Sequence, residues 1–473
     1  MKIIRGLFAT FLFASVALST VAQSTTLQYD IALTVNYDAG AFEGTAIVSY
    51  TNTTGIALSE LFFRLYANDP GLYGTAFVQI LDITIQTASV TYALYLNDTV
   101  VLVPLAKPLQ PDEPIEVNIA FSGQASNWPS NLHIGSDDTG YGLLTKSDSA
   151  LTITTFYPML AVYSDEGWAL DPSSGFGDIL MGDTADYSVH LTTHAGPMPV
   201  TSGELVAVNP EVNSTTYDFV AQNARDFSMA LVDTNYTPMT GELEDAIIRT
   251  WFTTQAELAG QLALDMAVSS FELYEELVGL CPFREIDLVE VPLRSAAGVE
   301  FSGLILIASQ YSLQPRDLFF SIIVSHEMAH QWFYAGVGND VSEHPWLDES
   351  FATYLSYEFL DSYYNTTTSL GELNTWRLAY QRAQQNWETL SISSPIYAFP
   401  SSSVYSSFVY SGGAIFLYEL KQLLGDEAFY RGLKDYYSTL LYRMAQPQDL
   451  IRIMEEACSC QIDNLLSIYR IVP

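Results

Sequence analysis

Two histidines four positions apart, with a glutamate directly after the first, form the segment of this sequence best suited to chemistry. The segment, residues 325–332, reads SHEMAHQW and contains His326, Glu327 and His330. On a helix, positions i and i+4 share a face, so both imidazoles can bind one metal ion, and imidazole nitrogen is a preferred ligand of Zn²⁺. Glu327 lies one position round the helix, where a carboxylate can take a proton from a metal-activated water without being a ligand.

Glu349 is the candidate third ligand. A catalytic zinc site usually has three protein ligands and a fourth position open to water. Glu349 lies 19 positions after His330, in residues 346–352 (WLDESFA), and Pro345 can start a second helix there. A helix–turn–helix return would bring Glu349 over the two histidines. Because the residues around the histidines are apolar, burying these groups together is unfavourable without a cation, so we expect one Zn²⁺ per chain bound by His326, His330 and Glu349.

The elements that position these residues change character along the chain. In the first half, Ile31, Leu33 and Val35 alternate with polar or small residues, a period-two pattern typical of half-buried strands that recurs to about residue 235. After that, strand patterns give way to helices, including expected helices over 255–279 and 315–334, the second beginning at a proline. We therefore expect a multidomain chain, with an N-terminal antiparallel β saddle or sandwich over residues 23–235 and an α+β domain over 236–473.

At the histidine segment the chain resembles the M1 family of zinc aminopeptidases. The family signature is His-Glu-x-x-His, eighteen residues, then Glu, and this sequence matches it at His326, Glu327, His330 and Glu349. Residues 346–352 are similar to the family's segment around its third ligand, although Asp348 stands where Asn is common. The resemblance implies a thermolysin-like (gluzincin) catalytic domain after a β saddle, in a short two-domain form without the C-terminal helical domain of longer members.

Two further motifs extend the resemblance. Residues 297–304 (AGVEFSGL) are similar to the family's Gly-x-Met-Glu-Asn strand, with Phe301 in place of Asn. The resemblance implies that Gly298 and Glu300 bind substrate, Glu300 through the free α-amine. Residues 409–415 (VYSGGAI) are similar to the family's Tyr-x-x-Gly-Ala segment, which implies that Tyr410 donates a hydrogen bond to the oxyanion. Tyr405 is the nearest alternative to Tyr410.

The charge balance excludes several classes of function. The 473 residues include 54 Asp plus Glu against 18 Lys plus Arg, a formal net charge of −36. Such a chain would be repelled by phosphate backbones and by anionic membrane surfaces, so we expect no nucleic-acid partner. A hydrophobic content of 49% allows a large packed interior.

Residues 1–22 are typical of a secretory signal peptide. Lys2 and Arg5 precede an apolar run over residues 6–20, and Ala22 ends a small-residue cleavage site. We expect no membrane span after signal removal and a secreted protein, extracellular or periplasmic, with association with the cell envelope left open. A retained anchor is the alternative, for which the apolar run is short.

Three cysteines, Cys281, Cys458 and Cys460, are too few for a disulfide framework. Cys458 and Cys460 are spaced too tightly for an easy bridge, and a bond from Cys281 to either is left open. We expect small buried residues at these positions.

The expected reaction is zinc-dependent hydrolysis of the N-terminal peptide bond of peptides with a free N-terminus, with Glu327 as general base. Two alternatives remain open. One is another gluzincin hydrolase, an endopeptidase or epoxide hydrolase, and the other is a secreted binding protein with a vestigial zinc site. The sequence reveals neither the preferred N-terminal residue nor the oligomeric state.

Overall fold

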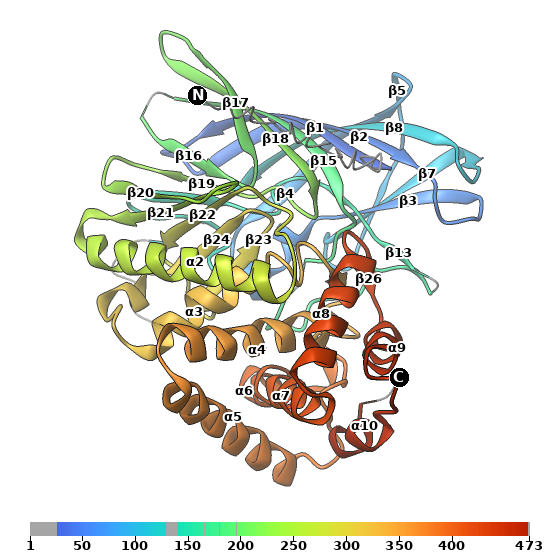
Figure 1. Ribbon diagram of the computed structural model, residues 1–473. Coiled ribbons are helices and arrows are strands. Elements are labelled where there is room, and N and C mark those ends of the chain that lie inside the picture. Colours follow the sequence, from blue (N-terminus) through green and yellow to red (C-terminus); the bar gives the residue numbers. More distant parts are fainter. Residues whose placement is uncertain (1–25, 129–140, 165, 179, 195, 472–473) are drawn as a thin grey trace, which may run out of the picture.

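The computed structural model describes residues 26–128, 141–164, 166–178, 180–194 and 196–471. The expected signal peptide, residues 1–22, lies outside these ranges. The first half of the chain is built of strands and the second half mainly of helices, with a second sheet between them (Figure 1). Within the described residues, no helix is long and apolar enough to span a membrane.

The largest sheet has eight strands in the order β17-β18-β15-β1-β2-β8-β4-β5. In β1, buried and exposed residues alternate over its whole length, as the period-two pattern predicts. The sheet is antiparallel except where β1 runs parallel to β15, a pairing that the long intervening chain allows. The strands are β1 (Leu27–Asn36), β2 (Ala41–Thr51), β4 (Phe77–Ile85), β5 (Ala88–Ser89), β8 (Pro114–Gln124), β15 (Ala185–His194), β17 (Glu204–Pro210) and β18 (Ser214–Ala224).

Smaller sheets complete the β-rich half. A five-stranded sheet contains β16 (Met198–Thr201), β19 (Met229–Val232), β11 (Ala150–Ile153), β10 (Leu144–Lys146) and β9 (Ser126–Asn127). A four-stranded sheet contains β12 (Met159–Leu160), β3 (Leu58–Arg64), β7 (Val100–Leu109) and β6 (Ala93–Tyr95), and β13 (Tyr163–Ser164) pairs with β14 (Gly167–Trp168).

The second half is α+β, as expected. Its sheet has the order β20-β21-β22-β24-β23 and consists of β20 (Tyr236–Glu242), β21 (Ile247–Thr253), β22 (Glu285–Val291), β24 (Leu304–Ala308) and β23 (Gly298–Phe301). The long helix α2 packs beside this sheet, and α3 to α10 follow below it in Figure 1. The longer helices are α2 (Glu257–Leu277), α3 (Leu318–Ala329), α4 (Trp346–Tyr363), α5 (Thr366–Asn386), α7 (Gly413–Leu424), α8 (Asp426–Leu440) and α9 (Pro447–Cys458); α6 (Ser402–Ser406) and α10 (Asp463–Tyr469) are short. Parallel strands β25 (Gly338–Asn339) and β26 (Met444–Ala445) form a last pair.

The helix expected over 315–334 is shorter at both ends. Pro315 lies in a turn before α3, where the amide of Asp317 donates to the carbonyl of Gln314. At the other end His330 caps the helix, and the chain turns through Tyr334, whose φ of 119° is outside the helical region. His326 and His330, the two candidate metal ligands, therefore lie at the C-terminal end of α3, His326 in its last turn and His330 at its cap.

The expectation that Cys458 and Cys460 cannot easily pair is wrong: they form a disulfide bond. Ser459 caps α9 in the left-handed conformation, with φ of 52°, and this turn brings the two Cα atoms to 5.1 Å, within the range that a bridge requires. Cys281 is free and buried, as expected.

A buried arginine joins the β-rich half to the turn after α3. The Arg225 guanidinium donates through Nε to the Tyr334 carbonyl at 2.6 Å, and through its two Nη atoms to the carbonyls of Gly182 at 3.0 Å and Arg443 at 2.9 Å. Burial lowers the pKa of Arg225 to about 10, so the side chain is still a cation at neutral pH. This one side chain thus fixes three backbone segments from both halves of the chain.

We expect Arg225→Met to lower the free energy of unfolding by about 3–5 kcal/mol, because it leaves buried carbonyls without a donor and nearby Asp183 without its compensating charge. Urea unfolding followed by fluorescence measures the change. Arg452→Met is the matched control, since Arg452 is half exposed and its ion pairs with Asp449 and Glu456 are on the surface. Equal effects of the two substitutions would contradict this role for Arg225.

Candidate active site

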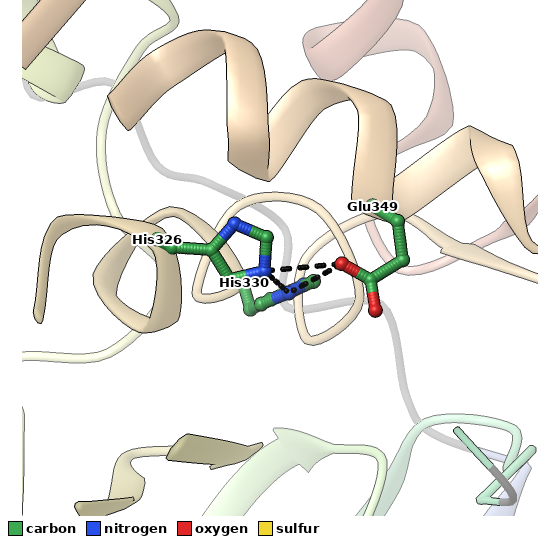
Figure 2. A group of neighbouring side chains, drawn as sticks. All are labelled: His326, His330 and Glu349. Atoms are coloured by element: carbon green, nitrogen blue, oxygen red, sulfur yellow. Dashed lines mark hydrogen bonds and ion pairs between the residues drawn. The ribbon is translucent and has the colours of Figure 1, made fainter. Parts of the chain in front are cut away.

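His326, His330 and Glu349 converge from two neighbouring helices (Figure 2). The Nε2 atoms of the two histidines are 3.1 Å apart, and Glu349 Oε2 is 3.0 Å from His326 Nε2 and 3.5 Å from His330 Nε2. Glu349 lies in the first turn of α4, which begins directly after Pro345, as the sequence predicts. The three residues are buried, and their ligand atoms all lie within 4.8 Å of one another. The helix–turn–helix return is therefore present.

The hydrogen bonds around the imidazoles leave the metal-facing nitrogens free to bind. His330 Nδ1 donates to the carbonyl of Phe333 at 2.9 Å, which leaves Nε2 as the ring nitrogen that faces Glu349. His326 Nδ1 lies 3.5 Å from Thr353 Oγ1, again on the side away from Glu349. Both rings thus present Nε2 to the same point.

The donor set fits a zinc ion. Two imidazole nitrogens and one carboxylate are the ligands of many catalytic zinc sites. Glu349 Oε2 is buried and faces both imidazole Nε2 atoms, so it can share one cation with them. Burial raises the pKa of Glu349, but hydrogen bonds and charge from His326 and His330 outweigh it and hold the pKa well below its usual range. Glu349 is therefore an anion aimed at the metal position.

Glu327 lies beside the metal position without joining the ligand set. Its carboxyl group, that of Glu300 and His330 form a second group whose ligand atoms lie within 4.8 Å of one another. Burial raises the pKa of Glu327 well above its usual range, and the Glu300 carboxylate raises it further. Gly298 makes room for this side chain: a Cβ at position 298 would lie 2.5 Å from both Cγ and Oε1 of Glu327.

The β23–β24 hairpin that carries Gly298 and Glu300 is fastened to the residue after His330. Gln331 accepts from the amide of Gly303 at 2.9 Å and donates to the carbonyl of Phe301 at 3.1 Å. Its side chain is fully buried, which explains why a polar residue interrupts the apolar pattern there. Two hydrogen bonds of one side chain thus link the hairpin to the C-terminal end of α3.

Asp226 fixes the same two segments from the β-rich half. Its Oδ2 accepts from the amide of Ser302 at 3.0 Å and from the hydroxyl of Tyr334 at 2.9 Å.

Sequence reasoning gave no role to Gln331, Arg225 or Asp226. The available signal was weak: each is a polar or charged residue next to apolar ones, and the sequence does not say which buried partners they meet.

Tyr410 reaches the site from a π-helical turn, Ser407–Gly412. Its hydroxyl donates to Glu349 Oε1, and its ring stacks on His326 with 5.6 Å between centroids. The turn approaches α4 closely, since a Cβ on Gly413 would lie 1.8 Å from Ser350 Oγ. Tyr405, the alternative, is also buried and packs edge-on against Tyr410, with its hydroxyl unpartnered.

Asp178, from the β-rich half, is a site residue that sequence reasoning missed. It lines the same cavity as Glu300 and Glu349, and its Oδ2 is buried without a hydrogen-bond partner. Burial raises its pKa, and the charges of Glu300 and Glu349 raise it further. Its segment, DPSSGFGD, reads as an ordinary turn, so nothing in the sequence indicates this position.

The cavity around these residues measures about 430 Å³. Its walls come from both halves of the chain. Tyr73, Tyr141, Leu143 and Leu180 line the β-rich side, and Phe319, Ile322, Ile323 and Trp376 line the helical side. Such a mixed cavity, apolar with a few convergent charged groups, is typical of a site for a small molecule or peptide end.

Residues 262–469, which hold all of the metal-facing residues, match the Peptidase family M1 domain. The chain is thus similar to peptidase family M1 over this part of its length. The resemblance at the histidine segment, the hairpin and Tyr410 is thereby confirmed at the level of the family, while the individual residue roles stay predictions.

Among curated relatives, the chain is similar to aminopeptidase M1-D of Oryza sativa, with 31% identity over 44% of this chain and 25% of the rice protein. It is also similar to mitochondrial aminopeptidase 2 of Saccharomyces cerevisiae, with 27% identity over 47% of this chain and 24% of the yeast protein. The chain thus spans about a quarter of the length of the curated relatives it matches.

Among solved structures, the fold is similar to the M1 zinc metallopeptidase from Deinococcus radiodurans, with a TM-score of 0.65, 17% identity and 94% coverage of each chain. A mutant of that protein bound to a Tyr-Ser-Ala substrate gives a TM-score of 0.62 at 17% identity, covering 94% of this chain and 95% of that one. At this identity the likeness concerns the fold, and it extends over both the β-rich half and the helical half of the chain.

We expect Gly298→Ala to lower kcat/KM by about 100-fold, because the new Cβ displaces the Glu327 carboxylate from beside the metal position. Zinc content, measured by atomic absorption, is expected to stay at one per chain, since the ligands are untouched. Gly371→Ala in α5 is the control, because a Cβ there meets no atom within 4 Å. Loss of activity in both variants would contradict a local effect on Glu327.

Proposed function

We propose that this chain is a zinc-dependent aminopeptidase that hydrolyses the N-terminal peptide bond of peptides. The observation that carries the proposal is the buried carboxylate of Glu300, grouped with Glu327 and His330 on a hairpin clamped to the metal helix. A carboxylate so close to the reaction centre, yet outside the ligand set, is suited to bind an ammonium group. A substrate held in this way has its N-terminus one residue from the bond that breaks.

The residues divide the chemistry between them. Zinc held by His326, His330 and Glu349 would polarise the scissile carbonyl and increase the acidity of the attacking water. Glu327 takes the proton from that water and passes it to the leaving amine; its raised pKa suits a group that holds a proton between the two transfers. Tyr410 donates a hydrogen bond to the carbonyl oxygen as negative charge develops on it.

Export from the cytosol is part of the proposal. It is supported by the signal-like residues 1–22 and by the Cys458–Cys460 disulfide, since disulfides persist mainly in oxidising compartments. The substrates are peptides with a free N-terminus, and neither nucleic acid nor a membrane surface suits a net charge of −36.

The wild-type protein with stoichiometric zinc is expected to release the first residue from aminoacyl reporter substrates. The Glu327→Gln variant is expected to retain zinc but to have a kcat at least about 1,000-fold lower, because it lacks the general base. Metal analysis and a reporter assay on the same samples provide both readouts. Purified protein that holds no stoichiometric zinc would instead favour the vestigial-site alternative.

Glu300→Ala is expected to lower kcat/KM for free-amine peptides by about 100-fold or more, because the variant loses a charge-assisted contact with the ammonium group. N-acetylated versions of the same peptides, which lack that charge, are expected to be poor substrates of the wild type and little changed by the substitution. Equal cleavage of free and acetylated peptides by the wild type would favour the endopeptidase alternative.

A further inference from the structure

One edge strand of the eight-stranded sheet is open to a further strand. β17 is the last strand of that sheet, and within the described residues β18 is its only partner in the sheet. The β17–β18 hairpin lies at the top of Figure 1, on the side of the β-rich half away from α3 to α10. The free side of β17 therefore presents backbone N–H and C=O groups with which another strand can pair.

The opposite edge of the same sheet is blocked by side chains. Beyond its short pairing with β5, the free side of β4 meets Asn68, which accepts from the amide of Val78 at 2.7 Å and donates to its carbonyl at 2.9 Å. Tyr92 donates to the carbonyl of Ile80 at 3.2 Å. Side chains that occupy the backbone groups of an edge strand prevent further pairing there. β17 has no such protection from the described residues.

The composition of β17 also differs from that of the other edge strands. Proline cannot donate to a neighbouring strand, and it interrupts β20 at Pro238 and β16 at Pro199. β6, β9, β12 and β23 have no more than four residues each. β17 has seven residues, with proline only at its last position, Pro210, and without charge over residues 205–209. This edge is therefore long enough and uncharged enough to pair with another strand.

The side chains of this open edge are apolar. Leu205, Val206 and Val208 are 51%, 58% and 47% exposed. A β-bulge leaves Val206 without a partner on β18. Leu205 and Val208 lie opposite Phe219 and Tyr217, whose rings stack on the same face of β18. The apolar face of the sheet thus continues past the part that the rest of the protein covers, as at surfaces that bind a partner.

Carboxylates surround the apolar part of the edge. Glu204 and Glu211 stand at its two ends. Beside Glu204, a surface depression is lined by four further carboxylates, those of Glu242, Glu244, Asp245 and Glu285. Arg284 is the one basic residue among the described residues that line it, and it already pairs with Glu275 at 3.0 Å. An incoming strand is therefore attracted if it carries lysine or arginine near its ends.

A second copy of this chain fits the edge less well than a basic strand. In an antiparallel pair of two β17 strands centred on Ala207, Glu204 of each copy would lie beside Glu211 of the other. Like charges would thus meet at both ends of the pair, on two chains that each carry a formal charge of −36. The charges favour a partner of the opposite sign.

We propose that the free side of β17 is a docking site for an extended, basic polypeptide segment, which adds a strand to the eight-stranded sheet. The main chain of the segment pairs with residues 204–210, and its apolar side chains cover Leu205 and Val208. Its lysine or arginine side chains lie near Glu204 and Glu211. The docking site lies outside the metal centre and goes beyond the proposed peptidase function.

A blocked octapeptide tests the docking site: N-acetyl-Lys-Val-Thr-Val-Thr-Val-Thr-Lys-amide, with a fluorophore at its C-terminus. Eight extended residues span about 26 Å, the length of residues 204–211. We expect saturable binding to the zinc-loaded protein, measured by fluorescence anisotropy. A version with Glu in place of both Lys, and a version with Pro in place of the central Val, are each expected to bind at least about tenfold more weakly, because one loses the charge attraction and the other a main-chain donor.

Two lysine substitutions on opposite edges of the sheet identify the strand. Val206→Lys is expected to raise the Kd of the basic peptide by at least about tenfold, because it puts a like charge at the middle of the open edge. Leu81→Lys on β4 is the matched control, since Leu81 is 55% exposed and the charge change is the same, but the edge there is blocked. Its Kd is expected to stay within about twofold of the wild type. Circular dichroism checks that both variants fold.

Hydrogen exchange followed by mass spectrometry locates the bound peptide. Exchange is expected to slow in residues 204–210 and to stay unchanged in the segments that line the metal centre. Absence of saturable binding, equal binding of the acidic peptide, or equal effects of Val206→Lys and Leu81→Lys would overturn the proposal. A wild-type dimer that Val206→Lys dissociates would also overturn it, because a second copy would then be the occupant. None of these readouts depends on peptidase activity.

Discussion

Glu349, Glu327 and Glu300 are buried in one cavity, and a buried carboxylate is unfavourable unless a cation or hydrogen-bond donors compensate it. The two imidazoles compensate Glu349 in part, by hydrogen bonds that lower its pKa. Burial raises the pKa of both Glu327 and Glu300, and the Glu300 carboxylate raises that of Glu327 further, while the charge of His330 offsets this only in part. The negative charge of these carboxylates is therefore not fully compensated within the site. The surrounding structure keeps the three side chains close together despite their mutual repulsion.

That support comes largely from the β-rich half. Arg225 and Asp226 lie between β18 and β19, and together they bind the turn after His330 and the hairpin of Glu300. They also hold Tyr334 in a positive-φ conformation that a non-glycine residue rarely adopts without such restraint. The β-rich half thus has two roles: it contributes a wall of the substrate cavity, and it fixes the C-terminal end of the metal helix.

The sequence predicts the parts of the site that depend on local periodicity. The spacing of His326 and His330 on a helix and the helix start at Pro345 lead to the three-ligand cluster that the structure contains. The features of the site that the sequence does not predict depend on contacts between segments far apart in the chain. Asp178 enters the cavity from a turn of the β-rich half, and Gln331 finds its partners on a separate hairpin. The Cys458–Cys460 pairing depends on one left-handed residue, Ser459, and spacing alone predicts the opposite.

Lysine and arginine residues are scarce both in the chain as a whole and around the cavity. The chain has 18 basic residues against 54 acidic ones, and two that are buried or partly buried serve structure: Arg225 binds backbone carbonyls, and Lys421 pairs with Glu358 at 2.9 Å. No lysine or arginine of the described residues lines the cavity, so under the proposed function its positive charge comes from the metal ion and from the ammonium group of the substrate. Because each compensates a different carboxylate group, Glu349 or Glu300, neither replaces the other. Under the proposed function, a peptide with a blocked N-terminus would leave Glu300 uncompensated even when zinc is bound, and this electrostatic penalty would make the hydrolytic centre selective for chain ends.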